Sequence, residues 1–263
     1  MKLAVIGGGS TYTPELVAGL ALERERLDLA EFVLQDIDSE RREVVGGLAR
    51  RMLNAAGFTG TLTVTDDLDR ALDGASFVLI QLRVGGQTAR LSDETIPLAC
   101  GCIGQETTGA GGLGKALRTV PVVLDIANRV RELAADDAWI VDFTNPVGIL
   151  TRSLLDAGHP TVGLCNVAIG FQRSCARLLD VQPDRVLIEQ VGLNHLTWVR
   201  RVLVDGADVL PDLIADHGDE LAGHADVPRD VVDRLGAVPS YYLRYFYAHD
   251  DMLAEQLAGK PRA

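Results

Sequence analysis

Three consecutive glycines behind the first apolar run constrain the fold of this chain more than any other feature. Residues 2–7 read KLAVIG, a short continuous apolar run that is typical of a buried strand, and positions 7–9 are all glycine. Glycine lets the backbone turn sharply and approach a ligand closely. A helical pattern follows from Thr13 to about residue 27, with Pro14 suited to its first turn. The sequence therefore predicts a strand, a glycine turn and a helix, in that order.

Strand-like and helical segments alternate over the following 130 residues or so. The further strand candidates are 31–36, 60–66, 76–82, 138–143 and 161–165, the helical candidates are 39–57 and 113–134, and a long glycine-rich loop is expected after residue 82. Continuous apolar strands separated by helices are typical of a parallel sheet covered on both faces. We expect an α/β fold, a Rossmann-type doubly wound parallel sheet.

The pattern changes after about residue 180. Residues 186–193 and 195–204 could pair as strands, and residues 209–258 look mainly helical. We expect a second, smaller α+β domain. The predicted division places an NAD-binding domain in residues 1–160 and a metal and substrate domain in residues 161–263.

The glycine turn lies where a dinucleotide-binding fingerprint requires it. Gly7, Gly9, Ser10 and Thr11 would offer backbone and hydroxyl groups to a pyrophosphate at the start of a helix. Asp36 ends the second strand candidate, where its carboxylate can bind ribose hydroxyls and repel a 2′-phosphate, so NAD is favoured over NADP. A tyrosine replaces the third glycine. The alternative is a glycine turn of another α/β fold, with Asp36 as a loop carboxylate.

Bulk composition excludes several classes of protein. The net charge of −12 argues against a nucleic-acid surface, which needs clustered Lys and Arg. No apolar run approaches the ~20 residues of a membrane span, and the first residues lack the features of a signal peptide. Four cysteines in a chain of this length do not suggest a secreted disulfide framework. We expect a cytoplasmic protein without nucleic-acid or membrane partners.

Several segments together resemble motifs of the family 4 glycoside hydrolases. In chain order they are MKLAVIGGGSTYTPEL, RVGG with DETIPL, GQETTGAGG, DFTNPVG, GLCN and GLNHLTW. The resemblance implies an NAD- and divalent-metal-dependent glycosidase, an exception to the two-carboxylate enzymes. It further implies a 6-phospho-β-glucosidase acting on a phosphorylated disaccharide or aryl glucoside. In that chemistry NAD+ oxidises sugar C3, a base removes the C2 proton, and the aglycone leaves by elimination.

The same resemblance implies a metal site. Cys165 and His195 would be the two protein ligands, with sugar oxygens and water completing the shell, and manganese(II) is the expected ion. A thiolate and an imidazole would also suit zinc, iron or cobalt. Thirty residues separate the pair, so spacing alone leaves open a buried structural thiol and a hydrogen-bonded histidine. The other cysteines, Cys100, Cys102 and Cys175, are expected to be packing residues.

PSYYLRYFY at residues 239–247 resembles the family segment that carries the catalytic tyrosine, which maps onto Tyr242. The neighbouring Tyr241 leaves a second assignment open. A tyrosine of ordinary pKa ~10 needs help to act as a base near neutrality. The alternative is a packed helix face, since Tyr242, Tyr245 and Phe246 have i, i+3, i+4 spacing.

The resemblance also implies contacts to substrate and cofactor. Asn145 and Asn166 are expected to contact the sugar, and Asn166 favours the β branch of the family. Arg83 and Arg90 are candidates to bind the 6-phosphate, because guanidinium groups match phosphate oxygens, although each could be a solvated surface residue. Glu106 is expected beside the nicotinamide and the sugar.

Two other functions remain open from the sequence. The glycine turn, Asp36 and the Asn145-Pro146 pair would also suit an NAD-dependent 2-hydroxyacid dehydrogenase of the lactate/malate type. A non-catalytic NAD-binding remnant is the second alternative, because family members are longer and this chain stops at GKPRA inside what resembles a helix. We therefore expect a substrate domain that is incomplete at its C-terminus, and a homo-oligomer for the full-length chain.

Overall fold

The computed structural model describes residues 1–259 and divides into two compact units. The first unit comprises Met1–Arg90 and Leu113–Leu164, and the second comprises Leu91–Gly112 and the chain from Cys165 onward. The chain therefore passes between the units three times. Two of these passages lie inside helices, α4 (Gly86–Ala99) and α5 (Gly109–Leu133).

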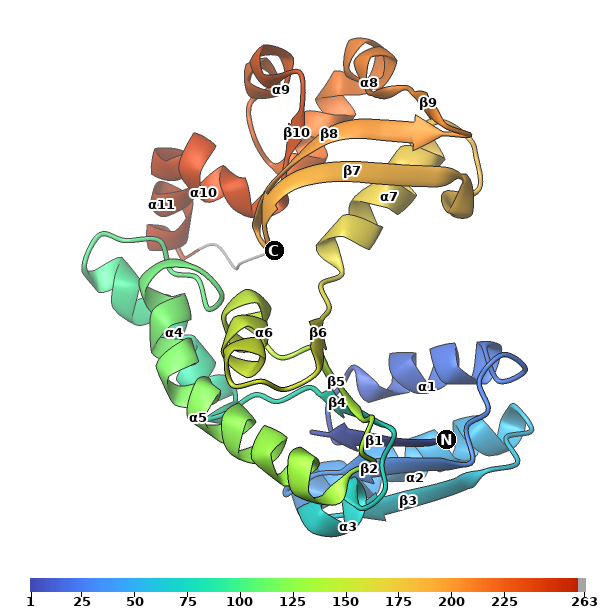
Figure 1. Ribbon diagram of the computed structural model, residues 1–263. Helices are drawn as coiled ribbons and strands as arrows, with labels where there is room; N and C mark the ends of the chain where they lie inside the picture. The colour runs from blue at the N-terminus through green and yellow to red at the C-terminus, as the bar shows by residue number, and fades with distance from the viewer. Residues whose placement is uncertain (260–263) are drawn as a thin grey trace. The chain divides into compact units, whose positions relative to one another are not determined.

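Six parallel strands form the sheet of the first unit (Figure 1), in the order β3-β2-β1-β4-β5-β6. Their bounds are β1 (Lys2–Ile6), β2 (Glu31–Gln35), β3 (Thr61–Thr65), β4 (Phe77–Ile80), β5 (Trp139–Asp142) and β6 (Thr161–Gly163). The order reverses between β1 and β4, and ligands of open α/β sheets bind beyond the carboxyl ends of strands at such a point.

Helices cover both faces of this sheet. On one face Val17 and Leu53, from α1 (Thr13–Leu22) and α2 (Ser39–Ala55), pack with Val5, Phe32 and Leu34 of the strands. On the other face, strand residues pack against α3 (Leu68–Leu72), α5 and α6 (Val147–Asp156). The fully buried strand positions explain the continuous apolar runs in the sequence. The Rossmann-type parallel sheet is confirmed.

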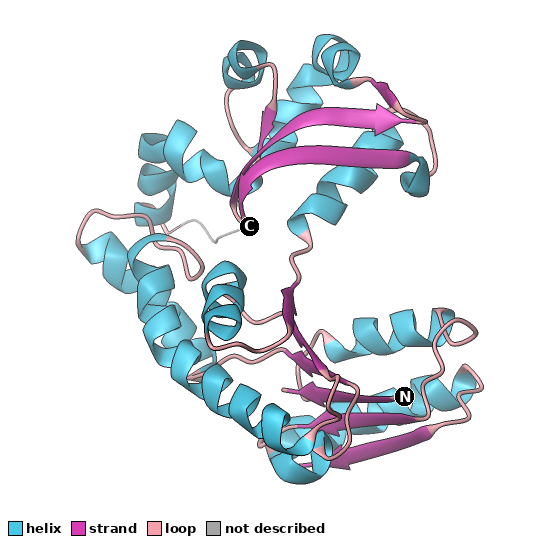
Figure 2. Ribbon diagram, viewed as in Figure 1, coloured by secondary structure: helices cyan, strands magenta, loops and turns pink. Residues whose placement is uncertain are grey.

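The second unit holds a smaller antiparallel sheet (Figure 2), in the order β10-β8-β7 with β9 paired to β8. The strands are β7 (Val186–Leu193), β8 (Leu196–Val204), β9 (Ala207–Asp208) and β10 (Val238–Pro239). The helices are α7 (Val167–Leu178), α8 (Leu210–Ala225), α9 (Arg229–Leu235), α10 (Arg244–Tyr247) and α11 (His249–Leu257), with 3-10 turns η1 (Pro183–Arg185) and η2 (Tyr241–Leu243). The predicted pairing of the two long strands and the mainly helical end are confirmed.

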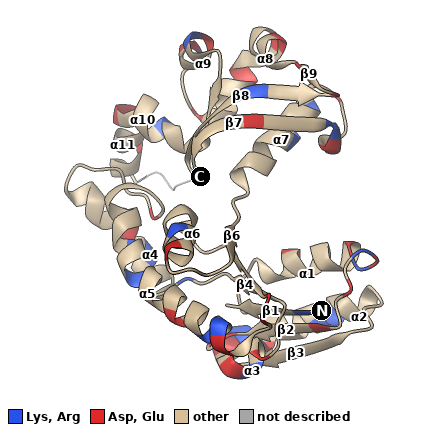
Figure 3. Ribbon diagram, viewed as in Figure 1, with Lys and Arg blue, Asp and Glu red and all other residues tan. Residues whose placement is uncertain are grey.

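The core of the second unit lies between this sheet and the helices α7, α8 and α9. Phe171, Val202, Leu213 and Leu221 are among its buried side chains. The opposite side of the β7–β8 ribbon is exposed and carries opposite charges on neighbouring strands (Figure 3), where Arg201 pairs with Glu189 at 3.1 Å. One side of the ribbon is therefore packed and the other is polar in its middle.

Two expectations about single elements were wrong. The segment after β4 is not a long loop, because α4 occupies residues 86–99. Gly85, in the turn before this helix, and Gly86, its first residue, have positive φ, and Pro97 near its end does not stop it. Helix α1 ends at Leu22 rather than near residue 27, with Glu23 as its C-cap.

None of the helices among residues 1–259 combines the length and the apolar character that a membrane crossing requires.

Candidate active site

In the second unit, two elements bring Cys165 and His195 together. Cys165 lies two residues after β6, directly before Asn166, the N-cap of α7. His195 is the second residue of the tight turn that joins β7 to β8, where Leu193 pairs with Leu196. The Cys165 Sγ atom lies 3.6 Å from the His195 Nε2 atom. A thiol and an imidazole thirty residues apart in sequence therefore face each other.

The turn holds His195 in an unusual backbone conformation. Its φ is 64°, in the left-handed region that costs a residue with a Cβ about 1–2 kcal/mol. Such conformations persist where surrounding structure enforces them, often at functional sites. Burial lowers the pKa of His195 to about 4. The ring is therefore neutral near pH 7 and keeps the lone pair that a metal ligand needs.

The pair fits a divalent metal ion by the geometry of its donors. With the bond lengths of zinc, about 2.3 Å to sulfur and about 2.1 Å to nitrogen, one ion would span the separation of 3.6 Å at an angle of about 110°. Among the described residues, no group of three or more His, Cys, Asp and Glu side chains is placed to hold an ion. A metal on this pair would therefore keep positions for oxygen ligands from outside the chain.

Tyr242 stacks directly on the imidazole of His195. The two ring centroids are 3.6 Å apart and the planes differ by 12°. Tyr241 instead lies under the guanidinium group of Arg244, whose Cζ is 3.8 Å from the Tyr241 ring centroid. Of the two tyrosines that the sequence left open, Tyr242 is thus the one beside the candidate metal ligand.

The alternative of a common buried aromatic face does not hold. Phe246 is 74% exposed, whereas Tyr242 and Tyr245 are half-buried. The three residues also belong to two elements, η2 and α10, rather than to one continuous helix. Tyr242 and Tyr245 contact each other edge-on, at a centroid distance of 6.4 Å.

A buried loop at residues 104–107 approaches the same tyrosines. Glu106 is only 5% exposed there. Its neighbour Gln105 accepts hydrogen bonds from the amide and hydroxyl of Thr107 and donates one to the Tyr245 hydroxyl at 3.0 Å. The loop is also tied to α11, since the Gly104 amide donates to the Gln256 side chain at 2.9 Å. The structure therefore places Glu106 in the unit that holds Cys165 and His195.

Two residues of this site escaped the sequence analysis. Gln105 stands inside the recognised GQETTG motif, but its partner Tyr245 is 140 positions away. Arg244 stands inside the PSYYLRYFY segment and is buried with 5% exposure. The sequence does show Arg244 as a charged residue between apolar and aromatic neighbours. That pattern indicates a buried ion pair only when the partner of the charge is known.

In the first unit, the glycine turn and Asp36 are joined directly. The Gly9 amide donates to the Asp36 Oδ2 atom at 2.7 Å, and the Asp38 amide donates to its Oδ1 atom at 2.9 Å. Gln81 donates to the Gly7 carbonyl and to the Thr13 hydroxyl, which anchors the turn to the start of α1. Ser10 and Thr11 follow in the same turn, so this predicted group lies together.

Close packing explains why the turn needs glycine. A Cβ at Gly8 would lie 2.9 Å from the Leu34 Cα, and one at Gly9 would lie 2.7 Å from the Asp36 carboxylate. Helix α1 has no side-chain cap at its N-terminus. The Tyr12 amide donates to the Ser10 hydroxyl at 3.2 Å and the Thr13 amide to the Ser10 carbonyl at 3.1 Å, so the turn itself satisfies the amides at the start of α1.

The remaining substrate candidates divide between the units. Arg83, in the loop after β4, and Arg90, in α4, are half-buried residues of the first unit. Asn145 follows β5 in the same unit, next to Pro146 in a cis peptide bond. Asn166 is exposed at the start of α7 in the second unit, and its side chain does not cap that helix.

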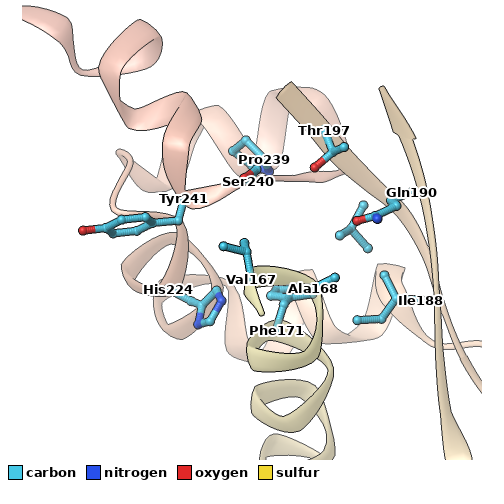
Figure 4. A pocket seen from close by; sticks show the side chains of 11 residues that line it. Val167, Ala168, Phe171, Ile188, Gln190, Thr197, His224, Pro239, Ser240 and Tyr241 are labelled. Atoms are coloured by element: carbon cyan, nitrogen blue, oxygen red, sulfur yellow. The ribbon is translucent and has the colours of Figure 1, made fainter. Parts of the chain in front are cut away.

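A separate pocket in the second unit lies between the first turns of α7, strands β7 and β8, and residues 239–241 (Figure 4). Val167, Ala168 and Phe171 line one side of it, and Gln190, Thr197, His224 and Ser240 add polar groups. The Ser240 hydroxyl is buried without a hydrogen-bond partner among the described residues. Neither Cys165 nor His195 lines this pocket, so it is not the candidate metal site.

The other cysteines separate into two kinds. Cys175 is fully buried in α7, as predicted, and burial raises its pKa to about 12. Cys100 and Cys102 are exposed, so their prediction as packing residues was wrong. Both lie directly after the end of α4, in a turn where Gly101 between them has a positive φ.

Comparisons with known proteins show the family of the chain. Residues 2–181 match the model of the family 4 glycosyl hydrolases, and residues 190–262 match that of the family 4 glycosyl hydrolase C-terminal domain. A probable 6-phospho-beta-glucosidase of Bacillus subtilis is 42% identical over 98% of this chain and 60% of its own length. The chain thus spans about three fifths of that curated relative.

Two solved structures are also similar. One is the 6-phospho-beta glucosidase from Thermotoga maritima with manganese, NAD+ and glucose-6-phosphate, at a TM-score of 0.91 and 35% identity, covering 99% of this chain and 63% of that one. The other is a malate dehydrogenase from Salinibacter ruber, at a TM-score of 0.60 and 22% identity, covering 92% and 72%. The second likeness concerns the fold alone. By both family matches, this chain belongs to the family 4 glycosyl hydrolases.

Proposed function

We propose that this chain carries the catalytic apparatus of a 6-phospho-β-glucosidase that depends on NAD and a divalent metal. The observation that carries the proposal is the 3.6 Å approach of the Cys165 thiol to the His195 imidazole, with Tyr242 stacked on that imidazole. Membership of family 4 and the relatives named for 6-phospho-β-glucosidase activity support the substrate class.

Cys165 and His195 would hold the metal, which we expect to be manganese(II), as in the Thermotoga maritima structure. A bound divalent ion would polarise sugar oxygens and stabilise negative charge on them. The chain contributes a neutral imidazole and a thiol at a separation that one ion can span. Asn166, exposed directly beside Cys165, would contact the sugar.

The glycine turn and Asp36 would bind NAD. Gly9, Ser10 and Thr11, in the turn before α1, would meet the pyrophosphate, and Asp36, whose carboxylate accepts the Gly9 amide, would meet the ribose. The nicotinamide would accept hydride from sugar C3. Arg83 and Arg90 would bind the 6-phosphate, Asn145 would orient the sugar, and Glu106 would face the nicotinamide and the sugar.

Tyr242 would act as the base that removes the C2 proton. The Tyr242 ring stacks on His195, one of the two proposed metal ligands, where a cation would stabilise a phenolate. Proton removal from the carbon next to a newly formed ketone allows the C1 group to leave by elimination. Addition of water at C1 and return of the hydride to C3 would then complete a hydrolysis with no net oxidation. The work of the chain is thus to bind the sugar and to hold Tyr242 at its C2 face.

The dehydrogenase alternative has weaker support. The likeness to malate dehydrogenase, at 22% identity, extends to the fold and no further. A lactate- or malate-type enzyme needs no thiolate and imidazole pair for a metal. The non-catalytic alternative predicts NAD binding without turnover, and the same experiment decides it.

The test is hydrolysis of p-nitrophenyl 6-phospho-β-glucoside with and without NAD+ and manganese, under reducing conditions. We expect release of p-nitrophenol that needs both additions. Tyr242→Phe should lower kcat at least 100-fold, the usual contribution of a general base, and His195→Ala should abolish activation by manganese. The matched controls Tyr241→Phe and His249→Ala, the latter on exposed α11, should retain activity. Release without NAD+ would contradict the mechanism, and NAD+ binding without release would support a non-catalytic chain.

A further inference from the structure

Arg244 is a buried cation with contacts that converge on the tyrosine cluster. Its side chain is only 6% exposed and donates to the Asp226 carboxylate at 2.6 Å. A second guanidinium nitrogen donates to the Tyr245 hydroxyl at 2.8 Å. The flat face of the group lies 3.8 Å from the Tyr241 ring centroid and 4.8 Å from that of Tyr245.

Both rings that Arg244 contacts also contact Tyr242. Tyr241 meets Tyr242 edge-on at a centroid distance of 5.9 Å and an angle of 84°, and Tyr245 meets it at 6.4 Å and 63°. Aromatic rings prefer such edge-to-face contacts, which fix the tilt of one ring against another. The position of the Tyr242 ring therefore depends on two neighbours that one guanidinium group holds.

The same network reaches the loop at residues 104–107. The Tyr245 hydroxyl accepts one hydrogen bond from Arg244 and a second from Gln105. Thr107 fixes the orientation of the Gln105 amide by donating to its oxygen. Arg244 is thus connected, through Tyr245, to the loop that carries Glu106.

Burying this charge has a cost that packing alone does not explain. A buried guanidinium loses its hydration, and apolar residues of similar volume often replace buried ion pairs without loss of stability. The Nε atom of Arg244 is buried with no hydrogen-bond partner among the described residues. The planar guanidinium group donates from two nitrogens to Asp226 and Tyr245 and lays its flat face on the Tyr241 ring. Neither an apolar side chain nor a lysine can make this combination of contacts.

We propose that Arg244 is a positioning residue that holds the Tyr242 ring in its stack on His195 and couples that stack to the 104–107 loop. The catalytic consequence rests on the proposed function, in which Tyr242 is the base. The structural part does not, because the stack itself can be observed without substrate, cofactor or metal.

The direct test is the NMR spectrum of histidine ring protons in the ligand-free protein. The chain has five histidines, and His195 should show a ring-current shift from Tyr242, identified by its loss in Tyr242→Leu. We expect Arg244→Gln and Arg244→Lys to remove at least half of that shift. His224, which contacts Phe171 at 5.2 Å in the same unit, serves as the internal reference and should keep its shift.

Matched variants sharpen the result. Arg234→Gln removes an exposed arginine of α9 that pairs along its helix with Asp230, and should leave every histidine unchanged. Tyr245→Phe keeps the ring but removes the hydroxyl, and should free the Gln105 side-chain amide without removing the His195 shift. An unchanged His195 in both Arg244 variants, or equal movement of His195 and His224, would overturn the proposal.

A kinetic readout separates this proposal from the proposed function. If Arg244 positions the base, Arg244→Lys should increase the isotope effect of a C2-deuterated substrate, because proton removal becomes slower relative to the other steps. A residue needed only for folding would lower the active fraction and leave the isotope effect unchanged. If the wild-type chain shows no NAD-dependent turnover, the proposed function fails, while the NMR experiment still decides the role of Arg244.

Discussion

Asp142, the last residue of β5, is a carboxyl group with no exposed surface. Its Oδ1 atom accepts the Thr144 amide at 3.0 Å, but its Oδ2 atom is buried without a hydrogen-bond partner among the described residues. Burial raises the pKa of Asp142 to about 7, and the Thr144 amide offsets only part of that rise. A carboxyl group at this position is thus protonated over much of the acidic range.

Asp142 should therefore make the free energy of unfolding decrease as pH rises from about 4 to about 7. Because the folded state binds the proton more tightly, the contribution of Asp142 is full below the unfolded pKa of about 3.9 and lost as pH rises through 7. Three pKa units correspond to about 4 kcal/mol at most. Asp142→Asn should remove this dependence, measured by urea unfolding at pH 5 and pH 8. The exposed control Asp137→Asn should keep it, and equal slopes for all three proteins would contradict the argument.

At the scale of elements, the β7–β8 hairpin supplies the metal-ligand candidate from its tip. The turn needs a left-handed residue at position 195, and the candidate site needs an imidazole there. Asparagine tolerates the left-handed region, whereas a β-branched residue does not. These two demands on His195 can be separated by substitution.

His195→Asn should keep the hairpin and lose manganese binding, because the turn conformation is retained without the ligand. His195→Val should lose both, and its free energy of unfolding should fall by about 1–3 kcal/mol relative to His195→Asn. Manganese binding can be followed by electron paramagnetic resonance and stability by urea unfolding. Manganese affinity that survives in His195→Asn would show that the ion binds elsewhere.

Sequence patterns predicted elements well where local signals were strong. All six parallel strands were expected, because continuous apolar runs that alternate with helical patterns are compatible with few folds other than a covered parallel sheet. Helix α4 was missed because the glycines after residue 82 indicated a loop, whereas Gly85 lies in the turn before the helix and Gly86 is its first residue. The proximity of Cys165 and His195 was expected only through the family resemblance. The roles of Arg244 and Gln105 could not be predicted, because their partners are distant in sequence and no local pattern identifies them.

At the scale of the whole molecule, the predicted division of labour between residues 1–160 and 161–263 can be tested with ligands. Hydrogen exchange should slow in peptides covering 7–13 and 31–38 on adding NAD+, and in peptides covering 163–168 and 192–197 on adding manganese. A ligand at 100 times its Kd stabilises the binding state by about 2.7 kcal/mol, or about 100-fold in exchange through unfolding. Protection of residues 192–197 by NAD+ alone would contradict the assignment.

Because the chain passes three times between its units, the second unit contains one segment that is synthesised early and others that are synthesised late. The segment 91–112 leaves the ribosome early, but its hydrogen-bond partners are synthesised much later. Gln105 bonds to Tyr245, 140 positions further along the chain, and Gly104 bonds to Gln256, 152 positions further along. Contacts that distant in sequence close slowly, because the chain entropy of a large loop is lost before the contacts form. The nascent chain must therefore carry this segment without its final partners until nearly all of residues 1–259 have been synthesised.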